Sequence, residues 1–551
     1  MRLKRTGTCI FLMLCMGITL FSCKDDNMIG DSPYANGPEP LVHFKDKKPS
    51  PAEGDPGTSV TFAVTGLNTS SDYTFYINQT EAEILSTSDS TVTVKIPEKA
   101  SSGAASVTLD GQAYYGPVFT VEGKVSIATS FNAFKGANHE ISQIIENPAA
   151  GYYIIVGSFT DYSGLVAASA SSDDEKTYIN HIAAISKTCD FREGSFQAGK
   201  GSNGSLNTIA RSTVDGDLFV GGTFGTYNVR SGINNITRLN LDASLDSMTV
   251  DLINLDPEQT PNAGTDTVPS FNGGVAGGLF TNVVKLFYDK PTDEVYVIGN
   301  FTKYINTYYK RSTKDGKIVY QTEMHQIIKL KRDGSLDSSF NYDPAKEKSA
   351  EGGNGYILDA VRTADDKMVI VGNFTTFNGK SVNRICRIDD KTGKIDMTFN
   401  TGSGADDAIG QISYNETTGK FLLTGAFHNF NGVPANGVVM LNADGSVDTN
   451  FKFGETTRGR ANFAGQLDNG LILVSGRFLK YNDVVRSGFM ILNPDGTLAD
   501  GYNNTGAFVG QINQIVEEKT TLGKPGVIIV GNFSLFNNRE VNNIVKIAMQ
   551  P

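Results

Sequence analysis

Apolar and polar positions alternate along most of this chain in short runs bounded by turn residues, a pattern typical of β-strands. Seven of these runs end in the same tripeptide, Gly-x-Phe. The seven tripeptides begin at Gly157, Gly222, Gly299, Gly372, Gly425, Gly476 and Gly531. A motif that recurs at this period indicates a repeat architecture built from small sheets. A residue that every repeat contains is expected to serve packing rather than catalysis.

The most regular repeat predicts a four-stranded unit. Residues 368–374 form an apolar strand, Asn378-Gly379 is a strong hairpin turn, and residues 383–388 alternate as the next strand. The unit ends in a segment of the type Asp-Gly-Ser-Leu-Asp, with clear copies beginning at Asp333 and Asp444. The last three Gly-to-Gly spacings are 53, 51 and 55 residues, which fits one propeller blade per repeat. The longer spacings indicate loop insertions in the earlier blades.

The two ends of the repeat region complement each other. The seventh repeat stops near Met549 without the Asp-Gly segment, and a partial copy of that segment stands at residues 125–132, before the first repeat. We expect this segment to pair with the last blade, because a closed ring leaves no exposed edge strand. An open solenoid is the alternative. Within each repeat, the Gly is expected to allow close approach or a bulge, and the Phe to pack between blades.

Residues 41–122 follow a different pattern. Alternating runs at 59–64, 73–77, 90–96 and 105–109 are separated by turn signals about every ten residues, which favours a small β-sandwich. The predicted fold is therefore all-β, with a small immunoglobulin-like sandwich followed by a seven-bladed β-propeller over residues 123–551.

The N-terminal segment reads as an export signal rather than as part of the fold. Residues 1–22 have a basic start and an apolar run of 13 residues, shorter than the roughly 20 that span a bilayer. The run ends in Leu20-Phe21-Ser22-Cys23, which resembles a bacterial lipobox and implies lipidation of Cys23. A simple cleaved signal with an incidental Cys is the alternative. Residues 23–40, rich in Pro, Gly, Asn and Asp, predict a flexible tether.

The residues directly after Cys23 are Lys24, Asp25 and Asp26. This charged cluster resembles the surface-export signal of Bacteroidetes lipoproteins, and implies display on the outer face of the outer membrane. The start of an ordinary solvated linker is the alternative.

Charge and cysteine content narrow the possible partners. Removal of the signal takes away three basic residues and changes the formal net charge from −11 to −14. This argues against nucleic acid and anionic membrane surfaces, which require clustered Lys and Arg. The lipid is then the only expected membrane contact. Beyond Cys23 the mature chain has only Cys189 and Cys386, so no disulfide framework is expected.

Catalytic, metal and cofactor motifs are not found in the sequence. The five His have no zinc-binding spacing, and no Gly-x-Ser-x-Gly elbow or Walker-type loop is present. Carboxylates are plentiful, so a propeller glycoside hydrolase or lyase remains the alternative function. The insertion at 303–311 carries Tyr304, Tyr308 and Tyr309, which could stack on sugar rings or line a peptide groove. A hairpin extension with ordinary aromatic packing is the competing interpretation.

Two domain families share these patterns. The order Pro-x-x-Gly-x-x-Gly-Thr-x-Val-Thr-Phe from Pro51 to Phe62 resembles the IPT/TIG family, and the recurring units resemble the delta-60-repeat β-propellers. With the lipobox and export signal, the chain resembles accessory surface lipoproteins of SusC/SusD-like nutrient-uptake systems. The resemblance implies a non-catalytic role, either capture of a glycan or peptide or docking on the transporter complex, with no cofactor.

Overall fold

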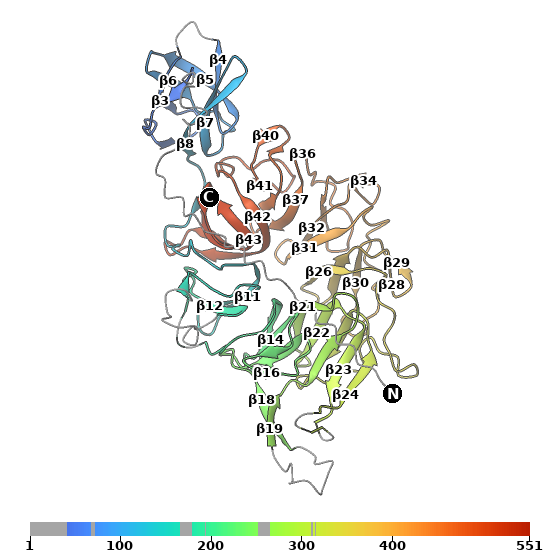
Figure 1. The fold of residues 1–551 in the computed structure, drawn as a ribbon. Helices are drawn as coiled ribbons and strands as arrows, with labels where there is room; N and C mark the ends of the chain where they lie inside the picture. Colours follow the sequence, from blue (N-terminus) through green and yellow to red (C-terminus); the bar gives the residue numbers. More distant parts are fainter. Residues whose placement is uncertain are drawn as a thin grey trace, which may run out of the picture.

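The computed structural model describes residues 41–67, 72–165, 179–192, 194, 196–251, 265–309, 312–313 and 316–550. The predicted signal segment and the predicted tether, with Cys23, Lys24, Asp25 and Asp26, lie outside these residues. The described chain is an all-β fold, and a small sandwich stands at one side of a ring of seven blades (Figure 1). The predicted fold class is confirmed. None of the described residues belongs to a helix long and apolar enough to cross a membrane.

The N-terminal sandwich is one continuous path of strands in the order β1-β3-β6-β5-β4-β7-β8-β2. Its strands are β1 (His43–Phe44), β2 (Glu53–Gly54), β3 (Ser59–Thr65), β4 (Tyr73–Ile77), β5 (Thr80–Thr87), β6 (Thr91–Lys95), β7 (Gly103–Leu109) and β8 (Gln112–Val121). Alternate residues of β3 point inward, as period-two patterning requires. The ring of Phe62 lies 5.0 Å from that of Phe75 and 6.4 Å from that of Phe119, so β3, β4 and β8 share one core.

Each blade of the ring is an antiparallel sheet whose first strand lies innermost. The blade strands are β10 (Ile141–Asn147), β11 (Tyr152–Gly157) and β12 (Ile182–Ile185); β13 (Leu206–Arg211), β14 (Leu218–Gly222) and β17 (Ile236–Leu239); β21 (Asn282–Asp289), β22 (Glu294–Asn300) and β25 (Ile327–Leu330); β26 (Ile357–Arg362), β27 (Met368–Gly372) and β30 (Ile385–Ile388); β31 (Ile409–Asn415), β32 (Lys420–Gly425) and β35 (Val438–Leu441); β37 (Ala461–Gln466), β38 (Ile472–Gly476) and β41 (Phe489–Leu492); and β42 (Val509–Lys519), β43 (Pro525–Phe536) and β45 (Ile544–Met549). In each of the first six blades, the fourth strand is reduced to a single β-bridge between the third strand and the segment that follows it, as between Leu330 and Leu336.

Short hairpins and small sheets extend the blades. They are β15 (Thr226–Tyr227) with β16 (Arg230–Ser231); β18 (Ser247–Asp251) with β19 (Thr265–Pro269); β20 (Gly273–Ala276) with β23 (Lys303–Thr307) and β24 (Val319–Glu323); β28 (Thr376–Phe377) with β29 (Lys380–Ser381); β33 (Asn429–Phe430) with β34 (Val433–Pro434); β36 (Thr456–Thr457) with β39 (Lys480–Tyr481) and β40 (Val484–Val485); and β44 (Arg539–Glu540) with β43. The predicted hairpin turn at Asn378-Gly379 is confirmed, since both residues have positive φ, 46° and 73°.

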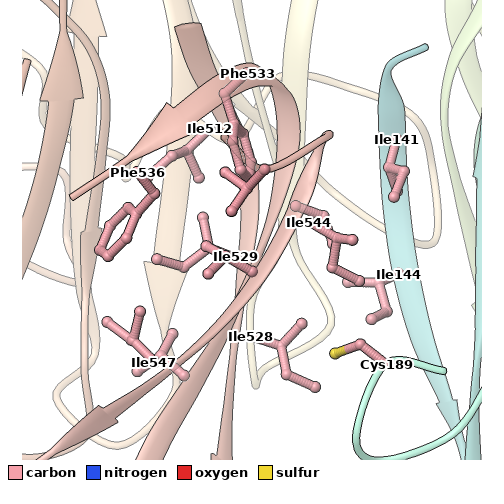
Figure 2. Packing of buried hydrophobic residues seen from close by; sticks show 14 of the residues in the cluster. Ile141, Ile144, Cys189, Ile512, Ile528, Ile529, Phe533, Phe536, Ile544 and Ile547 are labelled. Carbon is pink, nitrogen blue, oxygen red and sulfur yellow. The ribbon is translucent and has the colours of Figure 1, made fainter. Parts of the chain in front are cut away.

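The ring closes with strands from both ends of the repeat region. β9 (Val125–Ile127) pairs antiparallel with β45, placing Ile127 opposite Ile547 and Val125 opposite Met549. The predicted pairing of this segment with the last blade is therefore confirmed. Figure 2 shows the core at this closure, where Ile141 and Ile144 of the first blade face the isoleucines of the last.

The repeated Gly has a steric role inside each blade. Each one lies opposite a β-bulge in the innermost strand, as Gly157 does where the register shifts between Ile141 and Gln143. A Cβ added at any of the seven would lie 2.0–2.2 Å from the carbonyl oxygen of the residue that precedes its partner on the inner strand. Only Gly permits this approach. The close contact that the Gly allows therefore lies between two strands of one blade. The Phe of each repeat is buried, as predicted.

The sandwich is attached to the ring through hydrogen bonds between Asn504 and backbone and side-chain groups of the sandwich and the connecting segment. The backbone carbonyl of Asn504 accepts hydrogen bonds of 2.9 Å from both the N–H and the hydroxyl of Ser102. Its side-chain amide donates to the carbonyls of Val121 and Val125 at 3.2 and 3.0 Å. Since these residues flank the connection between the domains, they fix the sandwich on the last blades.

Candidate functional site

Tyr304, predicted to bind ligand, belongs to the scaffold. Its side chain is buried, with the residue 6% exposed, and its hydroxyl donates to the carbonyl oxygen of Gly334 at 2.8 Å. Burial raises its pKa to about 12. An aromatic residue occupies the same position, three residues after the repeated Phe, in all seven blades: Tyr162, Tyr227, Tyr304, Phe377, Phe430, Tyr481 and Phe536. The prediction is therefore wrong for Tyr304, because a ligand at the surface does not reach this ring.

Tyr308 and Tyr309 follow strand β23 and are half-buried. The ring of Tyr308 lies 5.5 Å from that of Tyr320, and the amine of Lys317 lies 5.7 Å from the ring centre of Tyr309. Burial raises the pKa of Tyr309 to about 12. The two tyrosines thus pack against the same hairpin extension, and Tyr304 does not join them on a common face. A ligand role for Tyr308 and Tyr309 stays a prediction.

A different aromatic pair is exposed where the third and fourth blades meet. Phe280 is 72% exposed and Tyr356 is 36% exposed, and their ring centres are 6.2 Å apart in an edge-to-face arrangement. Leu279, beside Phe280, is 86% exposed. The turn that presents Phe280 begins with Gly277 and Gly278, both at positive φ, before strand β21 starts at Asn282. Large apolar side chains gathered at the surface are typical of a binding site.

A groove of about 280 Å³ lies beside this aromatic pair and carries polar groups. Thr302, His325 and Glu351 line it together with the two rings. Nε2 of His325 lies 3.1 Å from a carboxylate oxygen of Glu323, outside the groove lining. Among the described residues, the Tyr356 hydroxyl and the Glu351 carboxylate have no hydrogen-bond partner, so both are available to a ligand.

Other polar groups of the groove are occupied by the fold. The side-chain oxygen of Asn354 accepts hydrogen bonds from the backbone N–H groups of Thr375 and Thr376, at 2.8 and 3.0 Å. The side chain of Gln326 bridges the N–H of Gly353 and the carbonyl of Gly355. These bonds fix the loop that carries Tyr356, so its ring is held in place before any ligand arrives. A fixed ring costs less conformational entropy on binding.

Sequence reasoning missed this site, although a signal was present. Gly277-Gly278-Leu279-Phe280 places two large apolar residues directly after two glycines. This motif lies in the longest interval between repeats, from Gly222 to Gly299, whereas the predicted ligand residues were the three tyrosines of the next insertion. In the described parts of the chain, no cluster of three His, Cys, Asp or Glu side chains could hold a metal ion.

Two domain families match parts of the chain. Residues 19–117 match DUF5008, a domain of unknown function. Residues 363–399, 417–451 and 467–498 match the DUF5122 β-propeller, also a domain of unknown function, and these segments lie in the fourth, fifth and sixth blades. The second match agrees with the propeller architecture. No curated protein matches the chain.

Several solved structures share a similar arrangement at low sequence identity. An auxiliary nutrient binding protein from Bacteroides thetaiotaomicron VPI-5482 is 11% identical with a TM-score of 0.35, and the match covers 92% of this chain and 99% of that chain. The WD40 repeats of RRP9 are 11% identical with a TM-score of 0.38, over 78% of this chain and 100% of that chain. A protein of unknown function from the same Bacteroides strain is 12% identical with a TM-score of 0.24, over 93% and 99%. Similarities this weak carry no argument about function.

Proposed function

We propose that this chain is a non-catalytic surface lipoprotein that captures glycans for an outer-membrane uptake complex of the SusC/SusD-like type. The observation that carries the proposal is the exposed pair of Phe280 and Tyr356 beside a groove with available polar groups. A sugar ring has an apolar face and a polar rim. The apolar face stacks on an aromatic ring, and the rim hydroxyls bond to groups such as the Glu351 carboxylate.

The proposed location follows from the N-terminal segment. Lipidation at Cys23 would anchor the chain in the outer membrane, and Lys24, Asp25 and Asp26 would direct it to the cell exterior. The propeller would then face the medium, attached to the membrane by its lipid alone. Placement beside a transporter gives a captured glycan a short path to uptake.

The binding test uses the mature protein against a panel of oligosaccharides and peptides. We expect at least one oligosaccharide to bind, and Phe280→Ala or Tyr356→Ala to weaken that binding by about 10-fold or more. Tyr115→Ala is the matched control, because Tyr115 is 74% exposed on the sandwich, away from the groove. Equal affinity in all three variants would exclude the aromatic pair as the site. Binding of peptides alone would replace the glycan by a peptide ligand.

Two further measurements test the rest of the proposal. A detergent pull-down through a C-terminal tag is expected to recover a SusC/SusD-like pair, and recovery of the chain alone would contradict the accessory role. When the protein is incubated with the glycan that it binds, the chain length of the glycan is expected to stay unchanged. New reducing or unsaturated ends would instead identify a hydrolase or lyase.

A further inference from the structure

A second and larger groove lies between the sandwich and the sixth blade. Its volume is about 860 Å³, and both domains line it. Lys99 and Ala100 come from the sandwich, whereas Tyr481, Arg486 and Asn503 come from the propeller. The groove therefore exists only when the two domains are in contact, and it is separate from the Phe280–Tyr356 pair.

Arg486, which lines this groove, is a buried cation without a counter-charge. The residue is 5% exposed, and burial lowers its pKa to about 10. Nη1 donates to the carbonyl oxygens of Lys99 at 3.2 Å and Val485 at 2.6 Å. Nε is buried without a hydrogen-bond partner, and among the described residues no carboxylate forms an ion pair with this guanidinium.

Two other largely buried arginines of the chain are paired with a carboxylate through Nε. Nε of Arg238 donates to Asp246 at 2.7 Å, and Nε of Arg387 donates to Asp396 at 2.9 Å. Both side chains are largely buried, at 12% and 11% exposure. Buried arginines are normally paired, because burying an unpaired charge is strongly unfavourable. Among the described residues, Arg486 has no acidic partner. Nη1 uses its two N–H groups on the carbonyls of Lys99 and Val485, which hold the guanidinium in one orientation and leave Nε and Nη2 as the free donors.

We propose that this interdomain groove binds a small molecule carrying one carboxylate group, which pairs with the Arg486 guanidinium. A guanidinium presents two parallel N–H donors that match a carboxylate. The rim also carries Asp55, Glu98, Glu122 and Asp500. Lys99 and Lys124 also line the groove and offset part of this negative charge. The mixed charge disfavours a polyanion, and a single carboxylate, on a sugar acid or an amino acid, is the chemistry that fits Arg486. The site requires both domains, since the sandwich supplies the carbonyl that orients Arg486.

The test is isothermal titration of the mature full-length protein with matched pairs of probes. D-glucuronate is compared with D-glucose, and L-alanine with L-alaninol, so that each pair differs by the carboxylate. We expect one carboxylate probe to bind at least about 10-fold more tightly than its match without the carboxylate, since a charge-assisted hydrogen bond is stronger than a neutral one. The pair that responds identifies the ligand as a sugar acid or an amino acid.

Variants then assign the binding to Arg486. Arg486→Gln is expected to weaken carboxylate binding by about 10- to 100-fold, and Arg486→Lys by less, because it keeps the charge but loses the fork. Phe280→Ala should leave carboxylate binding unchanged, so failure of glycan capture and failure of this proposal are distinguishable. The proposal is overturned if neither carboxylate saturates the wild-type protein, or if folded Arg486→Gln binds as the wild type does. If Arg486→Gln does not fold, the wild-type selectivity and Arg486→Lys decide.

Discussion

The side-chain oxygen of Gln514, on the innermost strand of the last blade, accepts a hydrogen bond of 2.9 Å from the backbone N–H of Ile144 on the innermost strand of the first. The bond repeats between other blades, since Gln143 accepts from Ile209 at 2.8 Å. The position that follows the bulge of the inner strand therefore joins neighbouring blades. Polar groups near the ring axis serve the ring in these cases, and should not be taken for a catalytic centre.

Replacement of Gln514 by Ala is expected to destabilise the ring. It leaves the N–H of Ile144 without its acceptor, and an unsatisfied buried donor costs about 1–3 kcal/mol. Urea unfolding followed by circular dichroism measures the change in the free energy of unfolding. Gln511→Ala is the matched control, since Gln511 is exposed on the same strand. Equal losses in the two variants would contradict an interblade role for Gln514.

Substitutions of Tyr304 test whether this residue stabilises the fold or binds a ligand. Tyr304→Phe removes the hydrogen bond to Gly334 and the one that the hydroxyl accepts from the side chain of Asn306. It is expected to cost about 0.5–1.5 kcal/mol of stability, since Phe stands at the same position in three blades. Tyr304→Ala should cost about 3–5 kcal/mol through the cavity it leaves. Urea unfolding gives both values, with Tyr320→Phe, 53% exposed, as the control. If a Tyr304 variant lost glycan binding while its stability stayed unchanged, Tyr304 would be a ligand-binding residue after all.

The architecture could be predicted because each blade is encoded by a local sequence pattern that repeats along the chain. Local sequence patterns predict the strands and turns in which they lie. These patterns are the alternation of apolar and polar residues, the Gly-x-Phe tripeptide and the partial copy at 125–132. The aromatic pair could not be predicted in this way. Phe280 and Tyr356 lie in different blades, so their contact depends on how the blades are set around the ring. Tyr304 was misassigned although its repeat was visible, because its neighbours Tyr308 and Tyr309 suggested a cluster.

Acid is expected to weaken the fourth blade through Asp389. Its carboxylate accepts hydrogen bonds from the hydroxyl and the N–H of Thr392, at 2.7 and 2.9 Å, and from Lys367 at 3.0 Å. The Thr392 bonds and the Lys367 charge outweigh burial and lower the pKa of Asp389 to about 2, from about 3.9 in an unfolded chain. Because the folded pKa is the lower one, this stabilisation is present above about pH 4 and is lost as the pH falls toward 2.

Unfolding measured from pH 7 to pH 2 checks this prediction. Asp389→Asn should reduce the acid-induced loss by about 1 kcal/mol, since Asp389 is partly exposed and solvent screens its charge. Asp483→Asn, at an exposed carboxylate, is the control. An unchanged pH profile in Asp389→Asn would show that these bonds do not stabilise the folded state.

Gly123 is expected to control how firmly the sandwich is attached. A Cβ at this position would lie 2.6 Å from the side-chain carbon Cγ of Asn504, so Gly123→Ala must displace Asn504 from Val121 and Val125. We expect faster proteolytic cleavage between the domains, with the propeller itself intact. Gly410→Ala provides the comparison, because the nearest atom to its added Cβ is 3.8 Å away. Cleavage at the wild-type rate would mean that Asn504 is not needed for the attachment.

The bonds that hold the sandwich also set an order of events during synthesis. Ser102 leaves the ribosome 402 residues before Asn504, its partner on the ring. The sandwich can fold early on its own core, but its attachment has to wait until the sixth blade has been translated. β9 likewise waits for β45, the last of the described strands. Until β45 has been translated, β9 and the earlier blades expose an unpaired edge, so the nascent protein depends on β45 to close the ring and avoid edge-to-edge aggregation.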